Sequence, residues 1–248
     1  MDNGQIACAG AFSEKINATK VKGIYYLAVD PESNKIIKES YTDLRLSMFG
    51  DDDDLDDEDK PQKPREKRAF YNYVFRKMIP LSDGRTVLVA EEQFEREGGS
   101  VSSSTNQYTV DYFRNNIIVV VISQDGSIGN ATMIRKRQVL SNGYYPLSYG
   151  MFRDDANLYF VFNDHVKNLD AEPDHKIKSY GGSFASLKQL ILELVTINSN
   201  GEIIRSQLIT EKEARSVAIP ISTYQVSPHE AVLFFQSNNK RRLGRISF

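Results

Sequence analysis

Residues 117–128 read Ile117-Ile118-Val119-Val120-Val121-Ile122-Ser123-Gln124-Asp125-Gly126-Ser127-Ile128. An apolar run rich in β-branched side chains is followed by a polar turn that contains Gly126, and then a second run begins. Such runs, bounded by Gly, Asn and Asp, are typical of β-strands. The stretch therefore predicts two strands joined by a tight turn.

The same signature occurs in two other parts of the chain, at residues 23–37 and 190–204. A second signature, a short apolar run, lies between the copies of the first. Its copies end at Gly10, Glu91, Asn163 and Gln236, which gives steps of 81, 72 and 73 residues. Self-similarity at a nearly constant spacing indicates a repeat architecture, and the longer first step is explained by a charged insertion near residues 51–68.

We expect an all-β fold of antiparallel four-stranded repeats, with one unit at residues 73–139 and the next at 146–209. Such repeats are typical of a β-propeller, here a partial or open propeller of about three to four blades. A β-sandwich is the alternative, since it also has short strands at regular spacing. A sandwich would not require the two signatures to recur together, so the pattern favours the propeller.

Strands are expected at regular intervals along the whole chain, with one helical turn within residues 208–216. The expected strands lie near residues 4–12, 22–29, 35–44, 72–80, 86–94, 110–122, 127–139, 147–152, 157–163, 188–197, 202–209, 219–226, 230–237 and 242–248.

Composition narrows the class of protein. The formal net charge of −2 gives no long-range attraction to nucleic acid, so no nucleic-acid partner is expected. The single cysteine, Cys8, excludes an intramolecular disulfide. No apolar run approaches the roughly 20 residues that a membrane span needs. The polar start, Met1-Asp2-Asn3-Gly4, does not resemble a signal peptide.

The chain begins and ends inside a repeat. We therefore expect residues 1–248 to form a single repeat domain that is the C-terminal part of a larger propeller. An open propeller would leave sheet faces exposed, which predicts a homodimer or a missing N-terminal half.

Residues 50–69 form a charged insertion. Asp51–Asp59 is almost entirely acidic, and five basic residues follow in Lys60–Arg68. Charge at this density predicts a disordered, solvated loop. The run does not fit an EF-hand, because counting from Asp52 places Asp57 at the sixth position and Lys63 at the twelfth, where Gly and Glu are needed.

The sequence contains no specific catalytic motif. The three histidines, His165, His175 and His229, have no metal-binding spacing. No glycine-rich phosphate loop follows a strand, and no nucleophile elbow is present. The pattern therefore favours a protein that is not an enzyme, with no resident cofactor.

One polar group suggests a ligand site. Glu91-Glu92 and Asn163-Asp164 end two successive copies of the second signature, and His165 follows. In a propeller these positions would lie side by side and form a carboxylate-rich arc that could hold calcium or a donor-rich ligand. The alternative is that these side chains hydrogen-bond strand-end and turn backbone, as Asn and Asp commonly do.

Several segments together resemble a known family. They are 79–84 (Ile-Pro-Leu-Ser-Asp-Gly), 89–94 (Val-Ala-Glu-Glu-Gln-Phe), 134–138 (Ile-Arg-Lys-Arg-Gln), 148–150 (Ser-Tyr-Gly) and 160–164 (Phe-Val-Phe-Asn-Asp). The chain is similar to an uncharacterised family of β-propeller-like proteins, of the WD40-like or six- to eight-bladed type, from Bacteroidetes-type bacteria. The resemblance implies a periplasmic, cell-surface or secreted protein and carries over no catalytic residues.

Two functions follow as hypotheses. The first is an exported binding or scaffolding module that presents loops to a protein or glycan partner. The second is a hydrolase-type enzyme with a carboxylate or metal site, formed by residues such as Glu91, Glu92 and Asp164, at the central channel. The absence of a recognisable nucleophile and base favours the binding module.

Overall fold

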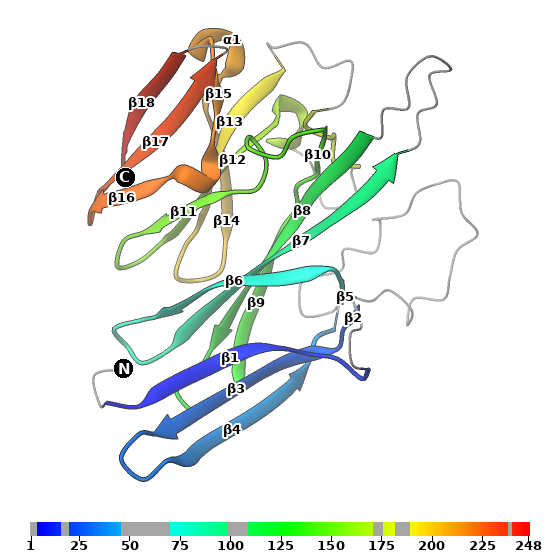
Figure 1. Cartoon of the computed structure of the whole chain (residues 1–248). Coiled ribbons are helices and arrows are strands. Elements are labelled where there is room, and N and C mark those ends of the chain that lie inside the picture. Colours follow the sequence, from blue (N-terminus) through cyan, green and yellow to red (C-terminus); the bar gives the residue numbers. More distant parts are fainter. Residues whose placement is uncertain are drawn as a thin grey trace. The chain divides into compact units, whose positions relative to one another are not determined.

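The computed structural model describes residues 4–15, 20–45, 70–98, 109–170, 176–181, 189–237 and 240–248 (Figure 1). The fold is all-β and its sheets are antiparallel, as the sequence predicts. The chain divides into two compact units. Unit 1 comprises residues 1–92 and 117–134, and unit 2 comprises residues 93–116 and 135–248. The expected single repeat domain stays a prediction, and the charged insertion at 50–69 lies outside the described residues.

The described strands follow the alternation of apolar runs and turns. In unit 1 or shared between the units they are β1 (Ile6–Phe12), β2 (Lys20–Val21), β3 (Gly23–Asp30), β4 (Lys35–Asp43), β5 (Phe70–Tyr71), β6 (Tyr73–Pro80), β7 (Thr86–Gly98), β8 (Thr109–Ile122) and β9 (Ile128–Ile134). In unit 2 they are β10 (Gln138–Ser141), β11 (Gly150–Arg153), β12 (Leu158–His165), β13 (Leu190–Ile197), β14 (Ile203–Thr210), β15 (Val217–Ala218), β16 (Tyr224–Ser227), β17 (Glu230–Ser237) and β18 (Lys240–Ser247). The helical elements are α1 (Glu211–Ala214) and the 3-10 turns η3 (Val166–Asn168) and η4 (Pro220–Ser222).

Each copy of the first signature folds into an antiparallel hairpin. The hairpins are β3–β4, β8–β9 and β13–β14. Asn34, Gly126 and Gly201 in the three turns have positive φ angles of 53°, 86° and 82°. Gly and Asn adopt this left-handed conformation at the least cost, which is why these residues recur in the turns.

Unit 1 contains two principal sheets. One has the order β1-β3-β4, and in the other β6 pairs with β7 and β9 pairs with β8. Alternate residues of β3, such as Ile24 and Tyr26, share a buried cluster with Leu88 of β7 and Ile118 and Val120 of β8. The core of unit 1 therefore joins one face of each sheet.

Unit 2 also contains two principal sheets. The first has the order β11-β12-β13-β14. In the second, β17 pairs with β18 along one edge and with β15 and β16 along the other. Val161 and Leu192 of the first sheet cluster with Ala218, Ala231 and Leu233 of the second. β12 is buried along its whole length apart from its first residue, so its alternate residues face two different interiors.

Two expected strands are interrupted or begin with another kind of element. The strand expected at 127–139 is interrupted after Ile134, where Arg135 and Lys136 are buried and bond outside the sheet ladder. The strand expected at 219–226 begins with the 3-10 turn η4, because Pro220 has no N–H to donate to a ladder. The propeller and the alternative sandwich both stay predictions. None of the helices in the described ranges could cross a bilayer.

Candidate functional site

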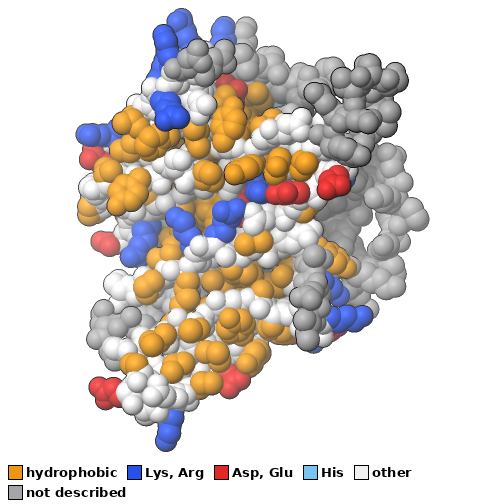
Figure 2. Space-filling view, viewed as in Figure 1, with side chains coloured by type: hydrophobic (Ala, Val, Ile, Leu, Met, Phe, Trp, Pro, Cys, Tyr) orange, Lys and Arg blue, Asp and Glu red, His pale blue; other side chains and the backbone are white. Residues whose placement is uncertain are grey.

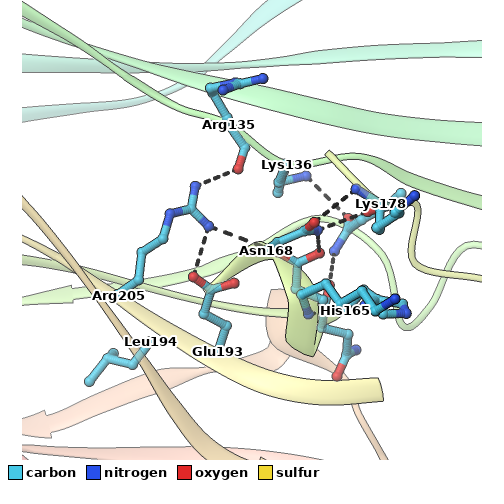
Figure 3. Close-up of polar contacts among 12 residues, drawn as sticks. Arg135, Lys136, His165, Asn168, Lys178, Glu193, Leu194 and Arg205 are labelled. Atoms are coloured by element: carbon cyan, nitrogen blue, oxygen red, sulfur yellow. Dashed lines mark hydrogen bonds and ion pairs between the residues drawn. The ribbon is translucent and has the colours of Figure 1, made fainter. Parts of the chain in front are cut away.

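Unit 2 encloses a cluster of charged and amide side chains (Figure 3). Asp164 and Glu193 are 0% exposed, and Lys136 and Asn168 are 1% exposed. The side chain of Arg205 is 14% exposed. Charged side chains are rarely buried unless they are paired, because burial removes their hydration. This concentration of buried charge makes the cluster the candidate site of unit 2.

The strand register brings three of these residues together. β12 pairs with β13 so that Phe162 is opposite Glu193 and Asp164 is opposite Ile191. Asp164 and Glu193 are therefore diagonal neighbours on one face of the sheet. On the next strand Arg205 is opposite Val195, two residues along from Glu193 on the same face. The alternation of side chains thus directs two carboxyl groups and one guanidinium into the same space.

Arg205 is the cation of the cluster. Its Nη1 donates to Glu193 Oε1 at 2.8 Å and lies 3.9 Å from Asp164 Oδ2. Its Nη2 donates to the carbonyl oxygen of Arg135 at 2.5 Å. The planar guanidinium therefore bonds a carboxylate and a backbone carbonyl at the same time, which suits its fixed fork of donors.

Asp164 holds a proton more firmly than an ordinary aspartic acid. Burial raises its pKa well above the usual value, and the charge of Glu193 and a hydrogen bond with that residue raise it further. Asp164 Oδ1 accepts from Asn168 Nδ2 at 2.7 Å. Neither Asp164 Oδ2 nor Glu193 Oε2 has another hydrogen-bond partner among the described residues. The raised pKa favours a protonated Asp164, whose O–H can serve as a hydrogen-bond donor in this enclosed cluster.

Arg205, Asp164 and Glu193 form a buried trio. Arg205 makes its short bond to the Glu193 carboxylate, and the raised pKa of Asp164 favours its protonated form. A buried group of this kind is stable only when its charges cancel and its polar atoms are bonded.

Asn168 connects the trio to a neighbouring segment. Its Oδ1 accepts from the backbone N–H of Lys178, and its Nδ2 donates to the Lys178 carbonyl oxygen, both at 2.8 Å.

His165 Nδ1 accepts from the N–H of Lys167 at 3.1 Å and so caps η3. Burial lowers the pKa of His165, and the nearby charges of Lys167 and Lys178 lower it further. Its bonded nitrogen and lowered pKa favour the neutral ring.

A second buried network lies within unit 2. Lys136 Nζ donates to the carbonyl oxygen of Arg114 at 2.8 Å and to Gln138 Oε1 at 3.1 Å. It also lies 5.9 Å from the centre of the Phe162 ring, a cation–π distance. Gln138 donates from Nε2 to the Asn163 carbonyl oxygen at 2.7 Å and accepts from the Ser148 N–H at 2.7 Å. Lys136 and Gln138 thus tie several backbone segments together.

The five predicted site residues fall in different units. Glu91 and Glu92 belong to unit 1, whereas Asn163, Asp164 and His165 belong to unit 2. The arc that would join them therefore stays a prediction. Glu91 is 0% exposed, and its Oε2 lies 3.6 Å from Arg76 Nε.

Asn163 and Asp164 point to opposite faces of β12 because they are adjacent in a strand. Asn163 Nδ2 donates to the carbonyl oxygens of Pro146 at 2.7 Å and Ala218 at 2.9 Å. Asn163 therefore bonds turn and strand-end backbone, which is the role given by the alternative hypothesis. Asp164 instead shares its environment with Glu193.

Sequence reasoning missed Glu193, Arg205 and Lys136. Glu193 had a detectable signal, since it is the one charged residue within the apolar run Leu190–Val195. A lone acid in such a run predicts a buried carboxyl with a partner. Arg205 and Lys136 carry no comparable signal, because basic residues are common on exposed strands.

The trio suits structural support better than a reaction with a substrate, because its two carboxyl groups are fully enclosed. Among the described residues, no three or more His, Cys, Asp or Glu side chains are arranged to hold a metal ion. Comparisons with protein-family models, curated proteins and solved structures found no match.

Proposed function

We propose that the protein is a binding module that recognises a protein partner through the outer face of the β16–β17–β18 sheet. The outer face is defined by Tyr224, Val232, Phe234, Leu243 and Arg245. The opposite face of β17, with Ala231 and Leu233, is buried in the core of unit 2. The outer face is thus the side of this sheet that the unit 2 core leaves uncovered.

The observation that carries this proposal is the exposure of large apolar side chains on neighbouring strands. Tyr224 is 70% exposed, Leu243 67% and Phe234 39%. The register places Phe234 opposite Leu243, and it places Val232 opposite both Tyr224 and Arg245. Hydrophobic side chains lie among Lys and Arg side chains over this part of the surface (Figure 2).

Single exposed apolar residues are normal, but adjacent ones mark interaction sites. The composition also fits a protein partner. Tyr, Phe and Arg are enriched in the centres of protein–protein interfaces. Val232 and Leu243 add aliphatic side chains to the outer face, and these favour contact with an apolar protein surface over a glycan. Exported location and a propeller-like architecture belong to this proposal as expectations from the resemblance.

The burial of the carboxyl groups counts against the hydrolase alternative. Glu91 and Asp164 are both 0% exposed, and each lies near an arginine. Glycoside hydrolysis requires a substrate bond between two carboxyl groups. Asp164 and Glu193 are both 0% exposed, so neither carboxyl group is open to a substrate.

Site-specific photo-crosslinking in the source cells tests the proposal. A photoreactive amino acid replaces Tyr224 or Leu243, and Tyr144, which is 54% exposed and lies outside the outer face, provides the matched control. We expect a discrete crosslinked protein from the two outer-face positions and none from Tyr144. Equal crosslinking from Tyr144, or none from either outer-face position, would refute the proposal.

A double variant gives a second measurement. Tyr224→Ser with Leu243→Ser should abolish the crosslinked complex, detected from a photoreactive group at Val226, which is 49% exposed. The free energy of unfolding should change by no more than about 0.5 kcal/mol, because both side chains are mainly solvated in the isolated protein.

A further inference from the structure

We infer that the partner adds a β-strand to the edge of β18, and that this strand carries acidic residues on either side of an apolar one. The inference rests on the proposed binding function and names the chemistry of the partner.

The edge of β18 is suited to strand addition. Among the described strands, β18 pairs with β17 alone, from Lys240 opposite Ser237 to Ser247 opposite Glu230. Its other edge presents backbone N–H and C=O groups at the spacing of a sheet ladder. Eight residues in register are enough to accept an extended peptide.

The charge around this edge is strongly positive. Lys240, Arg241, Arg242 and Arg245 are exposed on β18. Arg242 Nη1 donates to the Ala214 carbonyl oxygen at 3.0 Å, which brings the start of β18 next to α1. Lys and Arg side chains gather at the top of Figure 2, where Figure 1 has α1 and the start of β18.

α1 and the residue after it add to this charge. Lys212 and Arg215 are exposed there. The exposed acid of α1, Glu213, is bonded to Thr210 in a capping box, and Glu211 is buried with its carboxylate accepting from Tyr180. The exposed cations of this region, Lys212, Arg215, Lys240, Arg241 and Arg242, therefore outnumber the two acids of α1.

The side-chain order of β18 specifies the partner. Arg241, Leu243 and Arg245 alternate along the outer face, because Leu243 is opposite the outer-face residue Phe234. Directly opposite side chains on adjacent strands interact, and opposite charges and apolar pairs are the favourable ones. A strand with the order acid–x–apolar–x–acid would therefore match this row. Arg245 already lies 3.5 Å from Glu230, but both side chains are exposed and this ion pair is weak.

Other occupants fit less well. A second copy of β18 would bring two rows of cations together, which is unfavourable for strands in contact. A nucleic acid would satisfy the cations, but phosphates only accept hydrogen bonds and would leave the edge carbonyls unpaired. The net charge of −2 also gives the protein no long-range attraction to a polyanion. Cations on an edge strand can also serve only to prevent aggregation, and the experiment separates that role from binding.

An NMR titration of the whole chain tests the inference. The probe is the peptide Thr-Glu-Thr-Val-Thr-Glu-Thr, blocked at both ends and added to millimolar concentration, where weak strand addition is detectable. We expect shifts of β18 amides and slower hydrogen exchange at their unpaired N–H groups. The same peptide with Lys in place of Glu, and a Glu peptide N-methylated at alternate residues, should produce neither change. An oligothymidylate of similar charge is the nucleic-acid probe.

Variants then test the assignment of the charges. Arg241→Glu should weaken binding of the acidic peptide roughly fivefold and improve binding of the Lys peptide. Lys35→Glu, at an exposed position at the start of β4, is the matched control and should leave both affinities unchanged.

Each other outcome overturns the inference. These are equal binding of the N-methylated peptide, tighter binding of the oligothymidylate, and absence of any shift in β18, which would leave the edge cations a protective role only. Such results do not affect the crosslinking at Tyr224 and Leu243, so a failure of the strand-addition inference is distinguishable from a failure of the binding function.

Discussion

Glu91 of unit 1 is the last residue of one copy of the second signature and Asp164 of unit 2 directly follows another copy, yet their surroundings differ. Both carboxyl groups are completely buried. Glu91 lies 3.6 Å from Arg76, whose side chain is 37% exposed. Asp164 is next to a second buried carboxyl group, that of Glu193, and an arginine that is 14% exposed.

The neighbouring strand accounts for this difference. The run of β13 beside Asp164 contains Glu193, whereas the corresponding run of β8, residues 117–122, contains no charged residue. Two copies of the second signature therefore bury an acid at or next to their end, and in unit 2 the neighbouring strand places a second carboxyl group beside it.

The largest expected effect comes from removing the buried cation. Arg205→Met should lower the free energy of unfolding by about 3–5 kcal/mol, because it leaves the Glu193 carboxylate buried without its partner. Urea denaturation followed by circular dichroism measures the change. A loss below about 1 kcal/mol would mean that the trio does not depend on Arg205.

A double variant keeps this experiment interpretable if Arg205→Met unfolds the protein. Arg205→Met with Glu193→Gln removes the cation and the carboxylate that it neutralises, and the amide has almost the same shape. The double variant should be more stable than Arg205→Met alone, since it removes the Glu193 carboxylate and the raised pKa of Asp164 favours its protonated form. A double variant less stable than the single one would contradict the assigned charges.

The sequence predicts the local structure of these regions better than their chemistry. Hairpins follow from apolar runs and from Asn34, Gly126 and Gly201 in the turns, which are local signals. The contact of Asp164 with Glu193 depends on a diagonal register between strands that are separated by residues 166–189. Spacing along the chain does not specify that register, so the sequence can mark Asp164 and Glu193 separately but cannot predict that they meet.

The second largest effect is a dependence of the unfolding free energy on pH, which Asp164 causes in unit 2. Its pKa is raised in the folded protein, so folding favours its protonated form. This stabilisation is complete below the unfolded pKa of about 4 and is lost as pH rises through the folded value, by at most about 1.4 kcal/mol per pH unit. The substitution Asp164→Asn removes this pH-dependent contribution to the unfolding free energy.

Urea denaturation of wild type and Asp164→Asn from pH 4 to pH 8 measures the pH dependence that Asp164 contributes. The difference in unfolding free energy, wild type minus variant, should fall as pH rises. His165, whose pKa is lowered, has the opposite sign and cancels in this difference. A flat difference would show that Asp164 and Glu193 share no proton.

The smallest effect is expected in unit 1. Arg76→Met should cost about 1 kcal/mol, because the exposed part of the Arg76 side chain is hydrated and its 3.6 Å contact with Glu91 is partly screened. Arg96→Met is the matched control, since Arg96 is 67% exposed and faces Asp111, which is 20% exposed, and it should cost less than about 0.5 kcal/mol. The expected losses of unfolding free energy decrease in the order Arg205, Arg76, Arg96, which is the order in which these side chains become less buried. If Arg76→Met cost as much as Arg205→Met, burial of the cation could not be the cause of the difference between the two carboxyl sites.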